Sequence, residues 1–341
     1  MSKPKLTIRE LAQLADVSQT AVSYVLNGKP GVSDKTRRRI LDIIARTNYK
    51  ADRNSKRLAL HKSFNICLAY LDTSNPFDDL FYFEVAKGMV DCSNAYGYNI
   101  VLNKIDRRSS GLGLPEVITA KDADGVIVFQ DVDEQLIRTI ESYSIPCLVL
   151  DSYAKIDGVL SIGTDATAFT EEAVQYLIAK GHRKIGVICS NFIPDYWTQV
   201  YNGFASAMLK EHLLINPAWM QNTARDEVTA YRCMENILKY SPLPTAVFCV
   251  GDIYAIGVMR CIKEHGLRVP EDISVLGADN IILGRYCEPA LTTVNLSKVE
   301  MGRKALDLLI RRINAEPVES IRLSSHGIVE RASVCQRTDN P

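Results

Sequence analysis

One group of polar side chains in this sequence is spaced to lie on one side of a helix. Its members follow Ser18 and are Gln19, Thr20, Ser23, Tyr24 and Asn27. All five carry hydrogen-bonding groups and none of them is acidic. A helix face of this composition suits the base edges and phosphate oxygens of a nucleic acid.

A second group of polar side chains follows apolar runs that are typical of strands. Asp72 comes with Asn75, Pro76 and Phe77 after the first run, and Asp151, Asp252 and Asp279 follow later runs. Taken singly, an aspartate in such a place is a common helix cap or turn residue. Four of them at equivalent strand ends favour a binding cleft, because ligands of open α/β sheets bind beyond the carboxyl ends of the strands.

The first group is positioned by short helices that share a small core. Apolar residues recur at helical spacing in Ile8, Leu11, Ala12 and Ala15 and again in Ala21, Val22, Val25 and Leu26. Ser18 is placed to cap the second of these helices. Ser33 and Asp34 begin a third helix, in which Ile40, Ile43 and Ile44 face inward and Lys35, Arg37, Arg38 and Arg39 face outward. The pattern predicts a small all-α head.

From Ser63 onward the pattern changes to short apolar runs that alternate with helical segments. The runs are NICLAYL, NIVLNKI, DGVIVF and PCLVLD in a first series, and GHRKIGVICS, TAVFCVGD and ISVLGAD in a second. Helices are expected over 81–96, 167–180, 201–212 and 254–265. Continuous apolar strands between helices indicate parallel sheets that are covered on both faces. The pattern therefore predicts two doubly wound α/β halves of about 100 residues each.

Charge is distributed unevenly between these regions. The chain has 40 Lys and Arg against 40 Asp and Glu, but residues 1–62 contain 14 of the basic and 5 of the acidic residues. The head therefore carries +9 and the remainder carries −9. Clustered Lys and Arg are what the neutralisation of phosphates needs, so binding to a polyanion is expected at the head.

No pattern in the sequence indicates catalysis, a metal site or a membrane segment. The phosphate-loop, nucleophile-elbow and dinucleotide-binding motifs are absent, and the five histidines lack metal-ligand or triad spacing. The nine cysteines lack CxxC spacing, and Cys67, Cys147, Cys189 and Cys249 lie in strand-like runs, so reduced core cysteines are expected. The polar N-terminus and the absence of an apolar run of about 20 residues predict a cytoplasmic location.

These features together resemble the lactose-repressor (LacI/GalR) family. Residues 7–33, TIRELAQLADVSQTAVSYVLNGKPGVS, are similar to its helix-turn-helix, and the similarity continues through VSDKTRRRILDIIARTNYKADRNSKRLALHKS. The resemblance implies a helix-turn-helix DNA-binding domain at 1–50 and a hinge helix or linker at 51–62. It also implies an effector-binding and dimerisation domain at 63–341 with a periplasmic-binding-protein-like fold. The chain would cross between its halves three times, giving one half of about 63–163 and 294–322 and another of about 164–293 and 323–341.

The resemblance assigns the DNA contacts to the head and the hinge. The expected contact residues are Thr7, Ile8, Ser18, Gln19, Thr20, Ser23, Tyr24, Asn27, Ser33, Thr36, Arg53 and Leu58. Leu58 matches a leucine that members of the family insert into the minor groove, where such a wedge unstacks a base step and kinks the duplex. This chain departs from the family at Ala51-Asp52, where Pro-Asn is frequent. It departs again at Tyr24, where many members carry an arginine that can pair with guanine.

The resemblance also implies a small-molecule effector in the cleft between the halves. The expected contacts are Asp72, Asn75, Phe77, Asp151, Tyr196, Trp197, Asp252 and Asp279, with Asp279 foremost. The family commonly supplies an arginine and an asparagine where this chain has Val200 and Gly251. Without these donors an anionic ligand is disfavoured, because burying an uncompensated anion beside aspartates is costly. A sugar or other neutral polyol, a nucleoside or an amine is expected, and neither a cofactor nor a metal.

The function implied by the resemblance is sequence-specific regulation of transcription by a ligand-controlled repressor. Two copies of the chain would bind the half-sites of a pseudo-palindromic DNA operator as a homodimer. Two alternatives with the same type of sheet remain at this point. A soluble small-molecule-binding protein would not need the basic head, and a sugar- or nucleoside-processing enzyme would need a catalytic base or phosphate loop that the sequence lacks.

Overall fold

The computed structural model divides the chain into two compact units, Met1–Phe64 and Asn65–Pro341. The residues that it describes are 6–26, 29–47, 49, 57, 60, 62–71, 78–108, 111–129, 134–153, 156–190 and 194–337. Six of the expected contact residues lie outside these ranges, namely Asn27, Arg53, Leu58, Asp72, Asn75 and Phe77. Most of the expected hinge at 51–62 also lies outside them.

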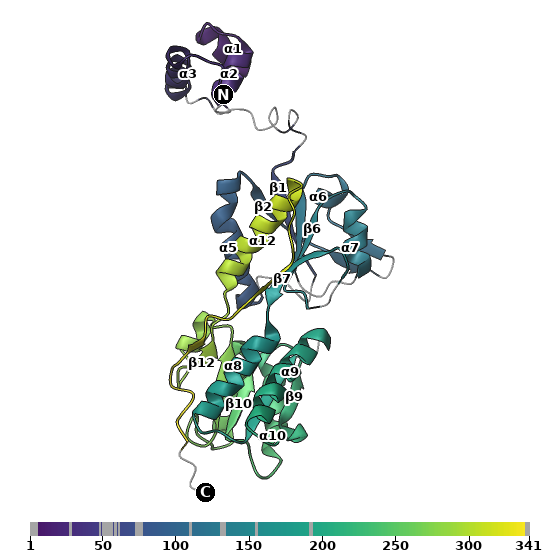
Figure 1. Ribbon diagram of the computed structural model, residues 1–341, viewed down its shortest axis with the longest axis vertical. Helices are drawn as coiled ribbons and strands as arrows, with labels where there is room; N and C mark the ends of the chain where they lie inside the picture. The colour runs from purple at the N-terminus through teal and green to yellow at the C-terminus, as the bar shows by residue number, and fades with distance from the viewer. Residues whose placement is uncertain are drawn as a thin grey trace. The chain divides into compact units, whose positions relative to one another are not determined.

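In the part of the first unit that the structure describes, three helices pack around one small core (Figure 1). They are α1 (Ile8–Leu14), α2 (Gln19–Leu26) and α3 (Asp34–Thr47). The centre of the core is formed by Leu11, Val22 and Ile40, all fully buried, with Ile43 and Ile44 partly buried against them. The apolar spacing therefore predicted the inward faces of these helices correctly.

Each helix of the first unit begins at a side chain that caps it. Thr7 and Glu10 form a capping box on α1, in which the Thr7 hydroxyl accepts a hydrogen bond from the Glu10 N–H at 3.3 Å. Ser18 and Ser33 accept hydrogen bonds from the N–H three residues further on, at 3.2 Å and 3.3 Å. The caps predicted at Ser18 and Ser33 are confirmed, and a cap of this kind contributes about 1 kcal/mol.

The second unit consists of two α/β halves, each built on a six-stranded sheet (Figure 1). The first sheet has the order β13 (Ile321–Leu323), β7 (Leu160–Thr164), β6 (Cys147–Leu150), β5 (Gly125–Phe129), β1 (Asn65–Tyr70) and β2 (Asn99–Lys104). The second has the order β14 (Ile328–Val329), β12 (Thr292–Val294), β11 (Ser274–Ala278), β10 (Ala246–Cys249), β8 (Ile185–Ser190) and β9 (Met220–Thr223). The predicted parallel pairing is confirmed except for β14, which is antiparallel to β12.

Helices cover both faces of each sheet (Figure 1). In the first half, α5 (Leu80–Tyr96) and α12 (Lys298–Ile313) pack together on one face, and α6 (Glu116–Thr119) and α7 (Glu134–Glu141) cover the other. In the second half, α8 (Ala166–Ala179) and α9 (Pro194–Lys210) form one pair, and α10 (Glu227–Leu238) and α11 (Asp252–Glu264) form the other. The remaining elements are the hairpin of β3 (Asp106–Arg108) and β4 (Gly111–Gly113) and the short 3-10 helices η2 (Pro217–Trp219) and η3 (Ile282–Arg285).

Three of these helix pairs approach each other through a glycine. A Cβ at Gly302 of α12 would lie 2.0 Å from the carbonyl oxygen of Val85 in α5. Gly203 in α9 and Gly257 in α11 have the same relationship to their partner helices, at 2.3 Å and 2.1 Å. Since no Cβ can occupy such a position, each pair packs more closely than a side chain at the crossing would permit.

The chain crosses between the two halves three times, after β7, after β12 and after β13. Hydrogen bonds join these crossings to one another. The Asp165 N–H donates to the Leu323 carbonyl at 2.9 Å, and the Asn295 N–H donates to the Gly327 carbonyl at 2.8 Å. The three crossings therefore run as one bonded bundle.

The boundaries of the halves fall one residue later than the sequence suggested. Thr164 and Leu323 belong to strands of the first sheet, whereas Val294 still belongs to the second. Each strand thus continues for one residue past the expected crossing. The second unit itself begins at Asn65, two residues after the expected start.

All nine cysteines lie in the described part of the chain and none of them forms a disulfide. Cys67, Cys147, Cys189 and Cys249 are buried, as their apolar surroundings predicted. Among the described helices, none has the length and apolar composition needed to cross a membrane.

Candidate functional site

The polar face of α2 lies on the surface of the first unit. Gln19 and Thr20 are exposed, Ser23 is half-buried, and Tyr24 is 38% exposed. The ring of Tyr24 covers Gly31, where a Cβ would lie 3.2 Å from two ring carbons. The ring therefore packs on the turn after α2, while a large part of the side chain remains available for contact.

Other expected DNA contacts also hold the head together. The Thr7 hydroxyl donates to the Glu10 carboxylate at 2.9 Å, and the hydroxyls of Ser33 and Thr36 are hydrogen-bonded at 2.9 Å. Ile8 is partly buried against the core. These residues therefore have a role in the fold of the first unit as well as their expected place on DNA.

Two of the basic residues expected to face outward from α3 donate to backbone carbonyls. Arg37 is half-buried and donates to the Lys29 carbonyl at 2.6 Å, and Arg39 donates to the Asp16 carbonyl at 3.3 Å. The expectation is thus corrected for Arg37, because it satisfies a carbonyl in the turn after α2. The other three basic residues of that group, Arg39 among them, are exposed as expected.

A cavity of about 150 Å³ lies between the two halves of the second unit. The first half lines it with Asp78, Asp79, Leu80, Phe81, Tyr82, Asp151, Tyr153 and Thr164. The second half contributes Ser190, Tyr196, Arg225, Val250, Gly251, Ile253, Tyr254, Asp279 and Ile281, and Leu296 of a crossing completes the wall. Carboxyl groups and aromatic rings from both halves therefore surround one space.

Asp151 lies directly after β6 and is held by two tyrosines. Its two carboxylate oxygens accept hydrogen bonds from the hydroxyls of Tyr82 and Tyr153, both at 2.7 Å. The Tyr153 hydroxyl is also 2.9 Å from the Thr164 hydroxyl. Burial raises the pKa of the Asp151 carboxyl, and the two tyrosine hydrogen bonds oppose part of that rise. The carboxyl is thus oriented toward the cavity wall and can accept further hydrogen bonds there.

Asp279 lies directly after β11, on the opposite side of the cavity from Asp151. Burial raises the pKa of its carboxyl well above the ordinary value, and the nearby Asp252 carboxyl raises that pKa further. The backbone at Asp279 has a φ of +112°, and the following Asn280 has a φ of +55°. A bend of this kind places the carboxyl at the cavity at some cost in backbone strain.

Positive φ angles recur among the charged residues of the cavity. Asp151 has a φ of +56° and Arg225 has a φ of +74°, in addition to Asp279. Ten non-glycine residues in the described ranges have a positive φ, and three of them line this one cavity. Strained backbone tends to gather at binding sites, so the cavity is marked by its backbone as well as by its side chains.

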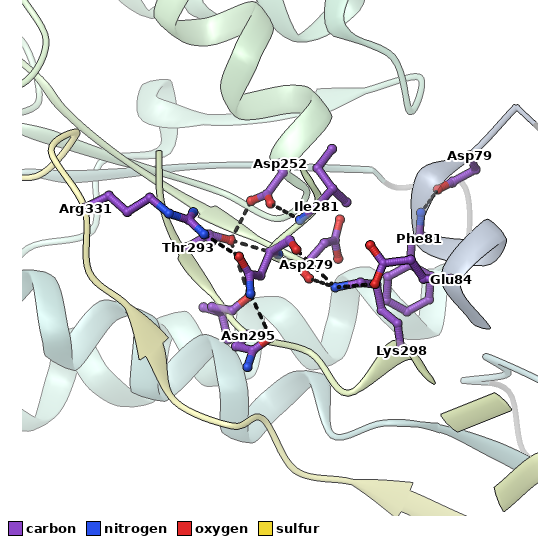
Figure 2. A network of polar contacts seen from close by, with 12 residues as sticks. Asp79, Phe81, Glu84, Asp252, Asp279, Ile281, Thr293, Asn295, Lys298 and Arg331 are labelled. Atoms are coloured by element: carbon purple, nitrogen blue, oxygen red, sulfur yellow. Dashed lines mark hydrogen bonds and ion pairs between the residues drawn. The ribbon is translucent and has the colours of Figure 1, made fainter. Parts of the chain in front are cut away.

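Asp252 does not line the cavity, although the sequence places it at a strand end. It is fully buried at the start of α11, where it accepts hydrogen bonds from the Thr293 hydroxyl at 2.5 Å and the Ile281 N–H at 2.8 Å (Figure 2). Burial raises its pKa to about 7, against the effect of these two hydrogen bonds. The carboxyl is therefore occupied in fixing the loop that follows Asp279.

Lys298, the first residue of α12, joins this loop to the first half. It is 4% exposed, and its ammonium group donates to the carbonyls of Asp279 and Asn280, the latter at 3.3 Å (Figure 2). The same group lies 3.8 Å from the Glu84 carboxylate of α5. The position of the cavity residue Asp279 is thus tied to the two helices that pack together on the first sheet.

Tyr196 and Trp197 occupy a helix that begins earlier than expected. The helix predicted over 201–212 is α9 (Pro194–Lys210), and both aromatic residues lie in its first turn. Tyr196 lines the cavity and Trp197 does not. Val200, at the place of the arginine common in the family, is fully buried.

Several cavity residues were missed by the sequence reasoning. They are Asp79, Phe81, Tyr82, Tyr153, Arg225 and Tyr254. Asp79 caps α5 by accepting from the Phe81 N–H at 2.8 Å, and it lies 3.9 Å from the guanidinium of Arg225 in the other half. Arg225 supplies a cation to the cavity. The expectation of a ligand without negative charge was based on Val200 and Gly251 and did not take this cation into account. Within the described ranges, no group of three or more metal-ligating side chains is placed to hold a metal ion.

The chain is similar to solved structures over both the head and the two halves. The chain is similar to a lac repressor dimer bound to operator and the anti-inducer ONPF, with a TM-score of 0.78 and 24% identity, covering 97% of this chain and 100% of that one. It is also similar to a transcriptional regulator CelR–cellobiose complex, with a TM-score of 0.70 and 24% identity, covering 96% and 100%. At this identity the likeness establishes the fold.

Sequence comparisons also show the family to which the chain belongs. Residues 7–52 match the family described as bacterial regulatory proteins, lacI family, and residues 174–334 match the periplasmic binding protein-like domain. The HTH-type transcriptional repressor PurR of Haemophilus influenzae is 32% identical over 313 residues, which cover 90% of this chain and 91% of that protein. The ribose operon repressor of the same organism is 30% identical over 318 residues, covering 93% and 94%.

A helix-turn-helix unit and a two-half α/β unit that encloses a ligand-sized cavity define a DNA-binding transcriptional regulator. The match to the DNA-binding domain over residues 7–52 decides between this class and a soluble binding protein with the same sheets. The chain belongs to the LacI family of bacterial regulatory proteins, and its relatives PurR and the ribose operon repressor are repressors.

Proposed function

We propose that two copies of this chain bind the half-sites of a pseudo-palindromic operator and that a small ligand in the cavity controls their affinity for it. The proposal rests on one observation, which is that both halves contribute side chains to the cavity wall. Asp151, Tyr82 and Tyr153 come from one half, and Asp279 and Tyr196 come from the other. A ligand held by both sets of residues favours one angle between the halves, and a conformational change needs such a difference in ligand affinity.

The ligand is a ring-sized polar molecule without net negative charge. A cavity of about 150 Å³ is the size of one that holds a single benzene ring. Its four aspartates face one arginine, so an added anion would be repelled. The aromatic rings suit the apolar face of a sugar or base, and the carboxyls suit its hydroxyl or amino groups. One relative is a ribose operon repressor and a similar solved structure is a complex with cellobiose, which agrees with a sugar-like ligand.

Binding to DNA is assigned to the exposed face of α2, with Gln19, Thr20 and Tyr24 reaching base edges. The head's charge of +9 supplies attraction to the phosphates. Leu58, which lies outside the described residues, is assigned to the minor groove by its resemblance to the family. Dimerisation is supported by the lac repressor relative, which is described as a dimer on its operator.

The test uses the full-length protein and a pool of random DNA duplexes. Selection is expected to recover a pseudo-palindrome, and the log of affinity is expected to fall by about 0.9 per neutralised phosphate for each tenfold rise in salt. A thermal-shift screen of sugars, nucleosides and amines then identifies a ligand, whose effect on operator affinity is measured by fluorescence anisotropy. Recovery of a single unpaired half-site, or an operator affinity that no bound ligand alters, would contradict the proposal.

A further inference from the structure

A second concave region lies beside the ligand cavity, and the proposed function does not use it. It is a groove of about 400 Å³ formed by the first turn of α12, the 3-10 helix η3 and the crossing after β12. Leu296 lines both the groove and the cavity. Asp279 lines the cavity and the next residue, Asn280, lines the groove. The two sites therefore share a wall.

The groove contains the N-terminus of a long helix with an unsatisfied cap. All four residues from Ser297 to Glu300 line it, and they form the cap and first turn of the 16-residue helix α12. Ser297 is 8% exposed, makes no capping hydrogen bond, and its hydroxyl has no hydrogen-bond partner in the described structure. A buried hydroxyl without a partner is costly, and a helix N-terminus attracts negative charge. Both features favour a negatively charged hydrogen-bond acceptor in the groove.

The charges of the groove have the opposite sign to those of the cavity. Arg285, Lys298 and Arg303 line it together with Glu84 and Glu300, which leaves one excess positive charge. Both carboxylates already have cationic neighbours. Glu84 lies 3.8 Å from Lys298, and Glu300 lies 2.7 Å from Lys304 and 3.3 Å from the ring of His326.

Arg285 and Arg303 are therefore the cations best placed for a ligand. Arg285 is exposed, and the only carboxylate within 4.0 Å of Arg303 among the described ion pairs is Asp91, at that limit. A guanidinium group binds the oxygens of a phosphate in pairs, and the backbone N–H groups of a helix start point at the same position. The Lys298 N–H already donates to the Leu296 carbonyl at 2.9 Å. Cationic side chains, the N–H groups of Val299 and Glu300 and a serine hydroxyl together form a set of donors for an oxyanion.

We propose that this groove is a second effector site and that it binds a phosphate group at the N-terminus of α12. The phosphate accepts from the Ser297 hydroxyl and the N–H groups of Val299 and Glu300 and is held by Arg303 and Arg285. Lys298, which ties α12 to the carbonyls of Asp279 and Asn280, lies in the same turn (Figure 2). An anion that orders this turn therefore acts on the residue that is foremost in the ligand cavity.

The test is thermal unfolding of the full-length protein in sodium phosphate and in sodium chloride at equal ionic strength. Above its Kd, phosphate is expected to raise the Tm with the logarithm of its concentration, by roughly 3 °C for each tenfold rise. Ser297→Asp places a carboxylate at the helix cap and is expected to abolish the response, and Arg303→Gln is expected to weaken it. Arg312→Gln, in the last turn of the same helix and outside the groove, is the matched control and is expected to respond as the native protein does.

Glycerol 3-phosphate, with glycerol as its control, distinguishes the two sources of the anion. A lower apparent Kd for glycerol 3-phosphate than for inorganic phosphate supports the proposal with a phosphate ester as the ligand, and equal values support it with free phosphate. The proposal is overturned if the native protein shows no specific phosphate response. It is equally overturned if Ser297→Asp and Arg303→Gln respond as fully as Arg312→Gln does. Because the readout is unfolding, failure here leaves the operator and cavity proposals unaffected.

Discussion

The rings of Tyr153 and Tyr196 meet across the ligand cavity, with their centroids 4.4 Å apart and their planes inclined at 48°. Tyr153 follows β6 in the first half, and Tyr196 lies in the first turn of α9 in the second. The ion pair of Asp79 with Arg225 makes a second connection between the halves at the same cavity. Side chains that line the ligand site therefore also hold the two halves together.

The contact between the two tyrosines is expected to stabilise the second unit. In a double-mutant cycle with Tyr153→Ala and Tyr196→Ala, the coupling energy in the free energy of unfolding should be about 0.5–1.5 kcal/mol. Chemical denaturation of the four proteins measures it. A cycle with Trp197→Ala in place of Tyr196→Ala is the control, because Trp197 does not line the cavity, and it should give a smaller coupling. Equal coupling in both cycles would mean that the ring contact does not join the halves.

Asp279→Asn is expected to make the protein more stable at neutral and alkaline pH while removing the ligand response. The folded protein holds the proton of this carboxyl more tightly than the unfolded chain, whose ordinary pKa is 3.8, so stability falls as pH rises above about 4. Asparagine has no proton to lose, and the gain over the native protein should grow from pH 4 to pH 8. Unfolding by urea across this range measures it.

Asp272→Asn provides the matched control for that experiment. Arg268 lowers the pKa of Asp272 to about 2, so its contribution is present above pH 4 and is lost as pH falls toward 2. The control should therefore be less stable than the native protein at neutral pH, the opposite sign. If Asp279→Asn behaves as the control does, the Asp279 carboxyl is stabilising and its assigned environment is wrong.

Gly302→Ala is expected to destabilise the protein, although the same change usually stabilises a helix. In an open helix it would add about 0.5–1 kcal/mol of stability. Here the new Cβ would lie 2.0 Å from the Val85 carbonyl oxygen, so α5 and α12 must separate, at a cost of roughly 1–3 kcal/mol or more. A rise in the urea midpoint of this variant would show that the two helices are not so closely packed.

Tyr24→Arg is expected to change the base that the head selects at one position of each half-site. Arginine pairs with guanine O6 and N7, whereas the tyrosine hydroxyl makes one hydrogen bond and its ring can contact a thymine methyl. Guanine should therefore appear at one position only with the variant, with a preference of roughly 1–3 kcal/mol. Parallel selections from one random pool compare the two proteins. Identical half-sites from both would place Tyr24 against the sugar–phosphate backbone.

The parts of the fold that follow apolar periodicity were predictable from the sequence. The three helices of the head, the buried strands and the positions of Asp151 and Asp279 at strand ends all follow from that pattern. Strand ends are good predictors because the chain must turn there and a side chain after the turn faces the cleft. The same rule failed for Asp252, since Val250 and Gly251 lie between it and β10 and move it into the helix.

Arg225 could not be predicted by the same reasoning. It follows β9, an edge strand with the sequence MQNT and only one buried residue, so no apolar run marks the end of a strand. Tyr82 and Asp79 were missed for a different reason. They belong to the start of α5, and only the tertiary fold brings that helix end opposite Arg225. Contacts between segments so distant in the chain leave no local pattern.

The bonded bundle of crossings leaves the two halves few ways to move. A single strand between them would allow twisting, bending and sliding, but the bonds from Asp165 to Leu323 and from Asn295 to Gly327 bind three strands side by side. Bending of one half against the other across the bundle is then the easiest motion. We therefore expect the ligand to act by changing this one angle between the halves. Substitutions that alter the response without touching ligand or DNA are accordingly expected to gather at these crossings. Gly327, whose φ is +82°, is one position in these crossings where a side chain would strain the backbone.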